Sequence, residues 1–218
     1  FRVCAEAYAE LQGHGSAALD TSFLRRDGTL FDAFVSLSCA SRTDPDGKIL
    51  FSIVDISKSR RAERELFWQN RELTAFHRIS EVMLSGKDEQ FIFDTIAREA
   101  GDMTDFPMVS IELCDFNRAV MVYRGAHGIP LHEMPDPFEV PMDVTLSGQV
   151  AHTGETLIER NISDRREYAA PILRHLGVQT FVCVPIKTNG HVLGTLSLSH
   201  PGQIHVEPRV VKAATSLA

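Results

Sequence analysis

The spacing of apolar and polar residues divides the chain into three regions with different periodicities. In residues 23–56 apolar and polar positions alternate between turn signals, which is typical of β-strands. Residues 57–85 contain no Gly or Pro between positions 59 and 83, and their apolar residues recur at spacings of three and four, which predicts one long helix. Residues 88–218 mix strand-like and helix-like patterns and predict a complete α+β domain.

The first region predicts a β-hairpin. A tight-turn pair, Asp27-Gly28, precedes the β-favouring run 30–39, and a second turn at 44–47 leads into a returning strand at 49–54. A lone hairpin is barely stable in water. The rest of its sheet is therefore expected to lie upstream of the chain, to come from another chain, or to be missing. Residues 1–20 look helical until two glycines interrupt the pattern.

The second region predicts a connector helix with an apolar seam of heptad character. Its polar seam positions are Gln69 and Ser80. The apolar seam positions are Ala62, Leu66, Leu73, Phe76 and Met83. Two interpretations remain open, a helix packed on its own domain and a helix paired with its copy in a dimer. The charged residues beside the seam favour the dimer.

The third region predicts an antiparallel sheet flanked by helices. The run 180–186 is almost entirely apolar, as in a strand that is covered on both faces, and Asn189-Gly190 is a strong signal for a two-residue hairpin. Helices are expected at 89–100, 147–152, 167–176 and from Pro208, strands at 109–114, 119–123, 180–186 and 192–199, and an extended stretch at 135–141.

Three segments of this region carry a resemblance to a known family. Residues 144–158 contain Gly-Gln-Val-Ala-His-Thr-Gly, residues 176–186 end in Val-Pro-Ile, and residues 190–198 read Gly-His-Val-Leu-Gly-Thr-Leu-Ser-Leu. In this order and at these intervals they resemble the GAF family from about residue 88 to 218. The resemblance implies a GAF-type sheet whose glycines support the fold. It also implies a domain that binds a ligand or a partner and passes strain to an output domain.

The first region resembles the C-terminal part of a PAS domain. The segments that carry this resemblance are Arg25–Phe31, Asp46-Gly47 and Ile53–Ser57, followed by Arg60–Glu63 as the usual signalling helix. The resemblance implies that the Asp of the closing segment, Asp55, bonds backbone donors where the strand gives way to the helix. Such bonds would fix the direction in which the helix leaves the sheet.

Composition and charge exclude several function classes. The 218 residues include 44% hydrophobic residues, and 29 acidic against 22 basic residues give a net charge of −7. This balance argues against a nucleic-acid or anionic-lipid surface. Cys4, Cys39, Cys114 and Cys183 lie far apart, which suits a reducing compartment, so we expect a cytoplasmic location. No apolar stretch is long enough to predict a membrane span.

The combined resemblance implies the input half of a bacterial-type sensor histidine kinase or diguanylate cyclase. We assign residues 1–57 to a partial PAS domain, 58–85 to the connector and 86–218 to the GAF domain. Because the chain starts without Met and shows no kinase or cyclase motif, we interpret it as a fragment whose covalent output domain lies elsewhere. We expect a non-catalytic sensory module that forms a homodimer through the connector and binds an unknown small molecule. The alternative is a transmission module that binds no ligand.

In the GAF family the ligand pocket lies between the sheet and an irregular helical segment, which corresponds here to residues 161–178. The candidate ligand-binding residues are Tyr123, Arg124, His127, Asp164, Tyr168, His175, Thr180 and Cys183. The sequence predicts no catalytic residue and no metal site, and it identifies no cofactor.

One enzymatic alternative stays open. Some free-standing GAF proteins are thiol reductases that reduce methionine sulfoxide with closely placed cysteines, and Cys114 and Cys183 would be neighbours if their strands pair. Both cysteines stand in apolar runs, whereas a reactive cysteine needs exposure and an electropositive setting. We therefore expect no thiol catalysis.

Overall fold

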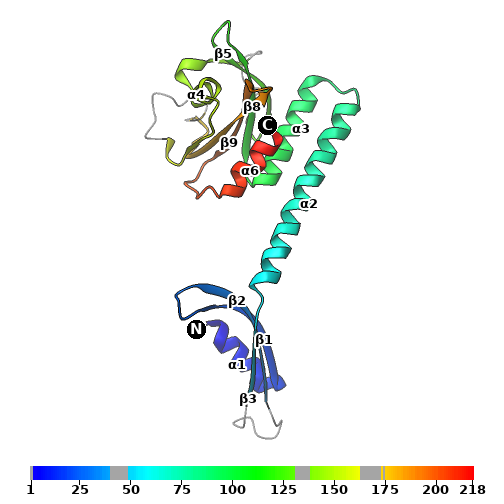
Figure 1. Cartoon of the computed structure of the whole chain (residues 1–218), viewed down its shortest axis with the longest axis vertical. Coiled ribbons are helices and arrows are strands. Elements are labelled where there is room, and N and C mark those ends of the chain that lie inside the picture. Colours follow the sequence, from blue (N-terminus) through cyan, green and yellow to red (C-terminus); the bar gives the residue numbers. More distant parts are fainter. Residues whose placement is uncertain (1, 40–48, 131–137, 163–172, 174) are drawn as a thin grey trace. The chain divides into compact units, whose positions relative to one another are not determined.

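The computed structural model describes residues 2–39, 49–130, 138–162, 173 and 175–218 (Figure 1). The chain divides into two compact units, Phe1–Asn70 and Arg71–Ala218. One long helix, α2, contributes residues to both units, and each unit is described below by itself.

The first unit contains one helix and a three-stranded antiparallel sheet. Its elements are α1 (Arg2–His14), β1 (Ser16–Leu24), β2 (Leu30–Cys39), β3 (Ile49–Asp55) and the first half of α2 (Ser57–Leu84). The strands lie in the order β1-β2-β3. The predicted strands at 30–39 and 49–54 are confirmed, whereas the second turn, at 44–47, lies outside the described residues.

The expectation of a single hairpin was wrong, because β1 precedes it and pairs with β2 along its whole length. Gly15, at φ 74°, allows the chain to leave α1 and enter this strand directly. Ala17 is buried against Ala7 and Leu11 of α1. The Ala-Ala-Leu sequence at 17–19 favours a helix by propensity, so packing against α1 outweighs local preference here.

Among the described strands, β3 pairs with β2 alone, and all seven of its residues are exposed. Its apolar side chains Leu50, Phe51 and Val54 are more than half exposed. Among the described residues of the first unit, the buried apolar side chains are therefore those of the cluster that α1 makes with β1 and β2, together with Ala33 and Val35 of β2.

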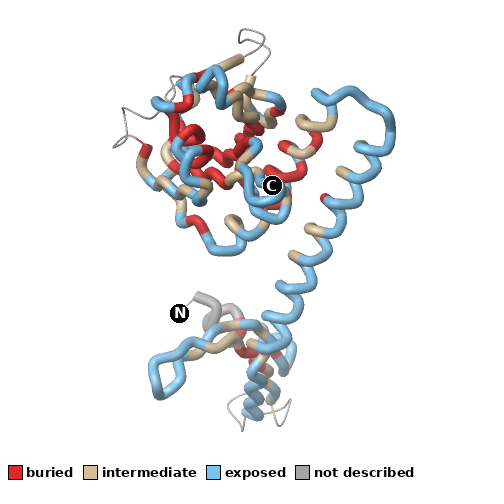
Figure 2. The backbone as a smooth tube through the Cα atoms, turned by 45° about the horizontal axis from the view of Figure 1, so that its top comes forward, coloured by how far each residue is buried: buried red, intermediate tan, exposed pale blue. Residues whose placement is uncertain are grey.

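Helix α2 confirms the connector helix within one residue at each end. In the second unit its Ala75 is buried, Arg71 pairs with Asp105 at 3.3 Å, and Arg78 pairs with Glu99 at 3.2 Å. These contacts fasten one face of the helix to its own domain. Most of α2 is exposed (Figure 2). The predicted seam lies on other positions than these contacts, and its Leu66, Leu73 and Met83 are 65%, 70% and 62% exposed.

The second unit is built on a six-stranded antiparallel sheet in the order β6-β5-β4-β9-β8-β7. The strands are β4 (Met108–Asp115), β5 (Val120–His127), β6 (Glu139–Pro141), β7 (Leu157–Glu159), β8 (Thr180–Thr188) and β9 (His191–His200). The helices are α3 (Glu89–Thr104), α4 (Leu146–Thr153) and α6 (Pro208–Leu217), with a short 3₁₀ turn at Met142–Val144. The predicted α+β class is confirmed.

Helices cover the two faces of this sheet differently. On one face α3 and α6 pack on an apolar cluster that includes Val109, Ile111 and Val182. On the other face α4 covers a second cluster, which includes Phe181 and Cys183. Residues 180–184 are all buried, so the expectation that this strand is covered on both faces is confirmed.

Several local expectations are also confirmed. Asn189 and Gly190 form the β8–β9 turn with φ of 49° and 82°, as the Asn-Gly pair requires in a two-residue hairpin. Pro208 stands in the first turn of α6. The predicted helix at 167–176 falls mostly outside the described residues, and so do residues 135–137 of the predicted extended stretch at 135–141. The rest of that stretch is confirmed, because Glu139–Pro141 form strand β6.

Two glycines confirm that close backbone approach supports the fold. A Cβ on Gly148 would lie 1.8 Å from the carbonyl oxygen of Met142, and one on Gly194 would lie 2.2 Å from that of Glu112. Gly148 therefore allows α4 to pack closely against the 3₁₀ turn before it, and Gly194 allows β9 to approach β4 closely. No larger residue fits either position without moving the backbone.

Candidate functional site

The face of the sheet under α4 carries buried polar side chains at its centre. Neighbouring residues of a strand point to opposite faces. Because Val109 and Ile111 face α3 and α6, Ser110 and Glu112 of β4 point toward α4. Thr195 of β9 stands opposite Glu112 in the register and is fully buried. The centre of this face is therefore polar although water does not reach it.

Glu112 is the centre of this cluster and is only 1% exposed. Ser110 Oγ donates to Glu112 Oε1 at 2.8 Å, and Thr195 Oγ1 donates to Glu112 Oε2 at 3.2 Å. The side chains of Ser147 on α4 and Tyr123 on β5 also hydrogen-bond to the carboxyl group. Four hydroxyl groups from four elements thus converge on one carboxyl group.

Burial dominates the acid–base chemistry of the cluster. It raises the pKa of Glu112 above its ordinary value, and the hydrogen bonds from Ser147, Ser110, Thr195 and Tyr123 partly oppose that shift. Burial, followed by the nearby Glu112 charge, raises the pKa of the Tyr123 phenol well above its usual value. The cluster favours a protonated Glu112 unless a positive charge is brought close to it.

A small cavity of about 10 Å³ opens beside the carboxyl group, which is room for about one water molecule. Its polar lining combines hydroxyls with the Glu112 carboxyl, and its apolar lining comes from α4, β8 and the loops around them. The lining residues are Ser110, Glu112, Tyr123, Ile129, Thr145, Leu146, Ser147, Leu173, Leu176 and Phe181. This cavity lies between the sheet and α4, whereas a wider and more open hollow of about 780 Å³ lies along β4 and β5, where Arg124 and Glu139 line it.

Residues 88–218, more than half of the chain, match the GAF domain family. The chain belongs to the GAF family. No curated protein matches it.

Solved GAF structures share the fold at low sequence identity. The GAF domain of a phosphoenolpyruvate-protein phosphotransferase from Acinetobacter aligns with a TM-score of 0.56 at 16% identity, covering 67% of this chain and 87% of that one. The corresponding domain from Coxiella burnetii aligns at 0.57 and 15%, covering 67% and 88%. Free methionine-R-sulfoxide reductase from Neisseria meningitidis, solved with its substrate, aligns at 0.51 and 14%, covering 67% and 85%. At these identities the likeness shows the fold alone.

Of the candidate residues, Tyr123 lines the cavity of this GAF domain, and Cys183 lies in the apolar cluster on the same face. Ser197 Oγ lies 3.4 Å from the Cys183 sulfur. These two residues are the ones that the structure brings to the site. Asp164 and Tyr168 lie outside the described residues.

The other candidates lie elsewhere. Thr180 shares the face of Val182, where its hydroxyl donates to the Gly202 carbonyl at 2.9 Å and so holds the loop after β9. His127 contacts α3 at Gly101, on the face away from the cavity. Arg124 stands at the β4–β5 bulge and is exposed, as is His175. None of these four side chains lines the cavity.

Sequence reasoning missed the polar centre of the site, namely Ser110, Glu112, Ser147 and Thr195. A signal was present, since polar residues alternate with apolar ones in both β4 and β9. Such alternation is ordinarily attributed to a solvent-facing side. Here the same pattern points into a pocket, because α4 covers that face. The one sign against a solvent-facing side was Glu112, a carboxylate on what proves to be an inner strand.

The two cysteines suggested for thiol chemistry are not on neighbouring strands, because β9 lies between β4 and β8. The condition under which Cys114 and Cys183 would be neighbours, a direct pairing of their strands, is therefore not met. Burial raises the pKa of Cys114 to about 11, and it raises the pKa of Cys183 further. Both are thiols at neutral pH, the unreactive form.

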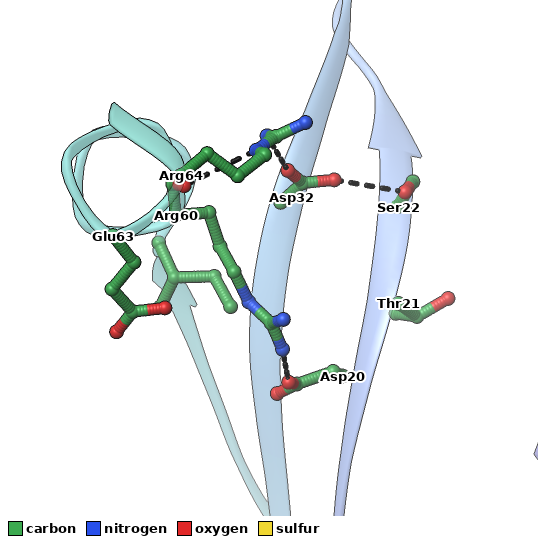
Figure 3. A pocket seen from close by; sticks show the side chains of 8 residues that line it. Asp20, Thr21, Ser22, Asp32, Arg60, Glu63 and Arg64 are labelled. Carbon is green, nitrogen blue, oxygen red and sulfur yellow. Dashed lines mark hydrogen bonds and ion pairs between the residues drawn. The ribbon is translucent and has the colours of Figure 1, made fainter. Parts of the chain in front are cut away.

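The first unit offers a second hollow, a groove of about 380 Å³ between the start of α2 and the strands β1 and β2. Arg60 pairs with Asp20, Arg64 pairs with Asp32 at 3.5 Å, and Ser22 donates to Asp32 at 3.2 Å (Figure 3). Four of its charged side chains thus pair with one another. These ion pairs attach the start of α2 to strands β1 and β2, and we call this region the joint.

Asp55 confirms the expectation for the strand-to-helix transition. Its carboxylate accepts a hydrogen bond from the backbone N–H of Ser57 at 3.0 Å and pairs with Arg25. The hydrogen bonds from Ser57, followed by that from Arg25, lower the pKa of Asp55 to about 2. The carboxylate is therefore charged at neutral pH and caps the start of α2.

The described residues contain no cluster of three or more His, Cys, Asp or Glu placed to hold a metal ion. Among the described helices, none combines the length and the apolar character needed to cross a membrane.

Proposed function

We propose that this chain is a non-catalytic sensory and regulatory module whose GAF domain binds a small molecule beside Glu112. The observation that carries the proposal is the buried carboxyl group with its ring of hydroxyls at the edge of a cavity. Burying a carboxylate destabilises the folded protein, so an apolar residue at this position would give a more stable fold. A perturbed carboxyl group in a pocket is a functional-site candidate on physical grounds.

A second candidate function is transmission without a ligand. The size of the cavity favours it, since about 10 Å³ holds no more than one water molecule or a group of that size. In that case the module would act through partner contacts alone. Solved relatives include the GAF domains of phosphotransferases, a methyl-accepting chemotaxis protein and an enzyme, so the fold does not choose between these roles.

The regulatory role would use the connector helix. We propose that residues 1–57 are the C-terminal part of a PAS domain, and the capping of α2 by Asp55 supports that assignment. The helix is fastened to a sheet at Arg60 and Arg64 and to the GAF domain at Arg71 and Arg78. A helix held at both ends can convert a small rearrangement into a shift that an output domain, such as a histidine kinase or a diguanylate cyclase, would sense.

We further propose that two copies pair through the seam of α2. The intradomain contacts use the face around Ala75, which leaves Leu66, Leu73 and Met83 exposed. Exposed apolar residues in heptad spacing pair well with a second copy of the same helix, because each fills spaces between the residues of the other. The polar positions Gln69 and Ser80 would set the register of the pair.

The proposal of a non-catalytic module rests on the described nucleophiles. Cys114 and Cys183 are separated by a strand, and burial keeps both protonated. A thiol reductase would need a thiolate that its substrate can reach.

Native mass spectrometry of the purified chain, with a visible absorption spectrum beside it, tests the proposal. A dimer that carries added mass is the expected result, and the added mass identifies the class of ligand. A dimer without added mass would favour transmission without a ligand. A bare monomer would contradict both the sensory and the dimer proposals.

A further inference from the structure

The buried carboxyl group of Glu99 on α3 depends on a cation that the connector helix supplies. Glu99 is only 4% exposed. Arg78 Nη1 on α2 lies 3.2 Å from Glu99 Oε1 and 3.4 Å from Glu99 Oε2, so that one nitrogen donates to both oxygens. Among the described residues no other cation pairs with Glu99. The connector helix therefore provides the counter-charge for a carboxylate that belongs to the GAF domain.

The two members of this ion pair differ in their access to water. The side chain of Arg78 is 56% exposed, whereas that of Glu99 is almost completely buried. If the two groups separate while α2 stays on the domain, water can solvate Arg78 but reaches Glu99 poorly. Removing one partner of a buried ion pair leaves an uncompensated charge, which destabilises the structure. Separation of this pair is therefore unfavourable mainly because of Glu99.

A second ion pair between α2 and the end of α3 lies in a different environment. Arg71 Nη2 is 3.3 Å from Oδ1 of Asp105, the residue that caps the C-terminus of α3. The Asp105 side chain is 66% exposed, and exposed ion pairs contribute little to stability. Of the two pairs, the one between Arg78 and Glu99 is therefore the one whose loss leaves a buried carboxylate unpaired.

The contact residues of α2 share one face of the helix. Arg71, Ala75 and Arg78 are separated by four and three residues, which is the spacing of neighbours on a helix surface. Ala75 is buried, whereas Leu73 on another face is exposed. A rotation of α2 about its own axis would carry Arg78 away from Glu99. Shifts and rotations of helices are common in switching transitions, and this one is opposed by the charge that it would leave unpaired.

We propose that the ion pair between Arg78 and Glu99 is an ionic lock that holds α2 in one rotational position on the GAF domain. A signal that turns α2 has to separate this pair, so the helix has two distinct states, locked and turned. The inference rests on the proposed regulatory role of α2 and names the contact that controls it. The lock requires neither a bound ligand nor a second copy of the chain.

Amide hydrogen exchange of the whole chain at pH 7, read by mass spectrometry, tests the lock in residues 71–84 of α2. Arg78→Gln removes the cation and leaves Glu99 unpaired in the locked position. Exchange in this segment should therefore accelerate by about tenfold or more. Exchange in strands β8 and β9 should stay within about twofold of wild type, because the lock concerns the position of α2 and not the stability of the sheet.

Three further variants make the result specific. Asp105→Asn removes the exposed α2–α3 pair and keeps a residue that tolerates the φ of 59° at this position, so exchange in α2 should change less than about twofold. Glu99→Gln removes the buried charge and should also have an effect below about threefold, since Arg78 remains in contact with water. Arg78→Gln combined with Glu99→Gln should match Glu99→Gln alone. That last comparison keeps the test valid if Arg78→Gln by itself does not fold.

The inference is overturned if Arg78→Gln accelerates exchange in α2 no more than Asp105→Asn does. Additive effects of Arg78→Gln and Glu99→Gln in the double variant would overturn it too, as would an acceleration that extends equally to β8 and β9. The proposed sensory function fails separately, because native mass spectrometry detects a bound molecule whether or not this lock exists.

Discussion

At the residue scale, Glu112 is the residue of the sheet whose carboxyl group determines the acid–base chemistry of the pocket. Its carboxyl group lies on an inner strand, accepts hydrogen bonds from neighbouring elements, and has little contact with water. The titratable side chains that interact with it are Tyr123, Cys114 and Cys183, and each has a raised pKa. Those three groups stay neutral below about pH 8, so any titration of the cluster between pH 4.5 and 8 belongs to Glu112.

Glu112→Gln should change how stability depends on pH. Because burial raises the pKa of Glu112 in the folded state, the wild-type chain without ligand keeps its full stability below the unfolded value near 4.5. It loses stability as the pH rises toward the folded pKa, by about 1.4 kcal/mol for each unit that separates the two values. The variant lacks this loss, so its stability relative to wild type should increase from pH 4.5 upward.

Urea unfolding of both proteins from pH 4 to pH 8 measures the difference, and other titrating groups cancel in the comparison. A constant difference between wild type and Glu112→Gln across this range would contradict the assignment of a raised pKa.

Gly148→Ala should destabilise the GAF domain by at least about 2 kcal/mol, because its methyl group would overlap the Met142 carbonyl oxygen. Gly13→Ala is the matched control in helix α1, where a Cβ meets nothing within 4 Å. That change should be neutral or stabilising, by up to about 1 kcal/mol. Chemical unfolding followed by circular dichroism distinguishes the two, and equal effects would show that the close contact at Gly148 is unimportant.

At the scale of elements, helix α2 holds two kinds of residue on different faces. Arg71, Ala75 and Arg78 contact the GAF domain or are buried by it, whereas Leu66 and Leu73 are largely exposed. The heptad spacing in the sequence identified the exposed seam. It did not identify the packed face, because that face is fastened by two arginines and one alanine, which no apolar periodicity reveals.

The joint at the start of α2 should depend on its two ion pairs. Replacing Arg60 and Arg64 by Gln removes the contacts with Asp20 and Asp32 but keeps the helix propensity. Exposed ion pairs are weak, so amide hydrogen exchange over residues 57–64 should accelerate only about twofold to fivefold. Arg61→Gln is the control, because Arg61 has no ion pair among the described residues, and it should leave the exchange unchanged. Equal acceleration in both variants would show that the joint does not depend on these pairs.

Leu66→Glu combined with Leu73→Glu should convert the expected dimer to a monomer, because like charges would face one another along the seam. Leu84→Glu makes the same change at an exposed leucine outside the seam and should leave the dimer intact. Analytical ultracentrifugation at several concentrations measures the outcome. An unchanged monomer–dimer balance in the double variant would exclude the seam as the interface.

At the scale of the whole molecule, the sequence predicts the strongly patterned elements and misses those that depend on packing. The strand 180–186, the Asn189-Gly190 turn and the long helix were all predictable, since periodicity and turn chemistry act locally. Strand β1 was not, because its Ala-Ala-Leu run favours a helix until α1 covers it. The pocket was missed for a similar reason, as β9 had to be placed between β4 and β8 before Glu112 and Thr195 could be seen to meet.

The candidate residues show the same division. Tyr123 and Cys183 were placed on the correct face, whereas Thr180 and His127 belong to the other one. Each of these residues lies on a strand, so its face depends on strand register and on the bulge between Ile111 and Glu112. Register is a property of the assembled sheet, and no local pattern in the sequence reveals it.

The most direct test of the account is the native mass of the chain purified in three forms, wild type, Glu112→Gln and Glu99→Gln. The account predicts added mass on wild type and on Glu99→Gln, and none on Glu112→Gln, because the ligand is held by the Glu112 carboxyl group. Added mass on all three forms, or on none, would contradict the claim that this carboxyl group is the centre of a sensory pocket.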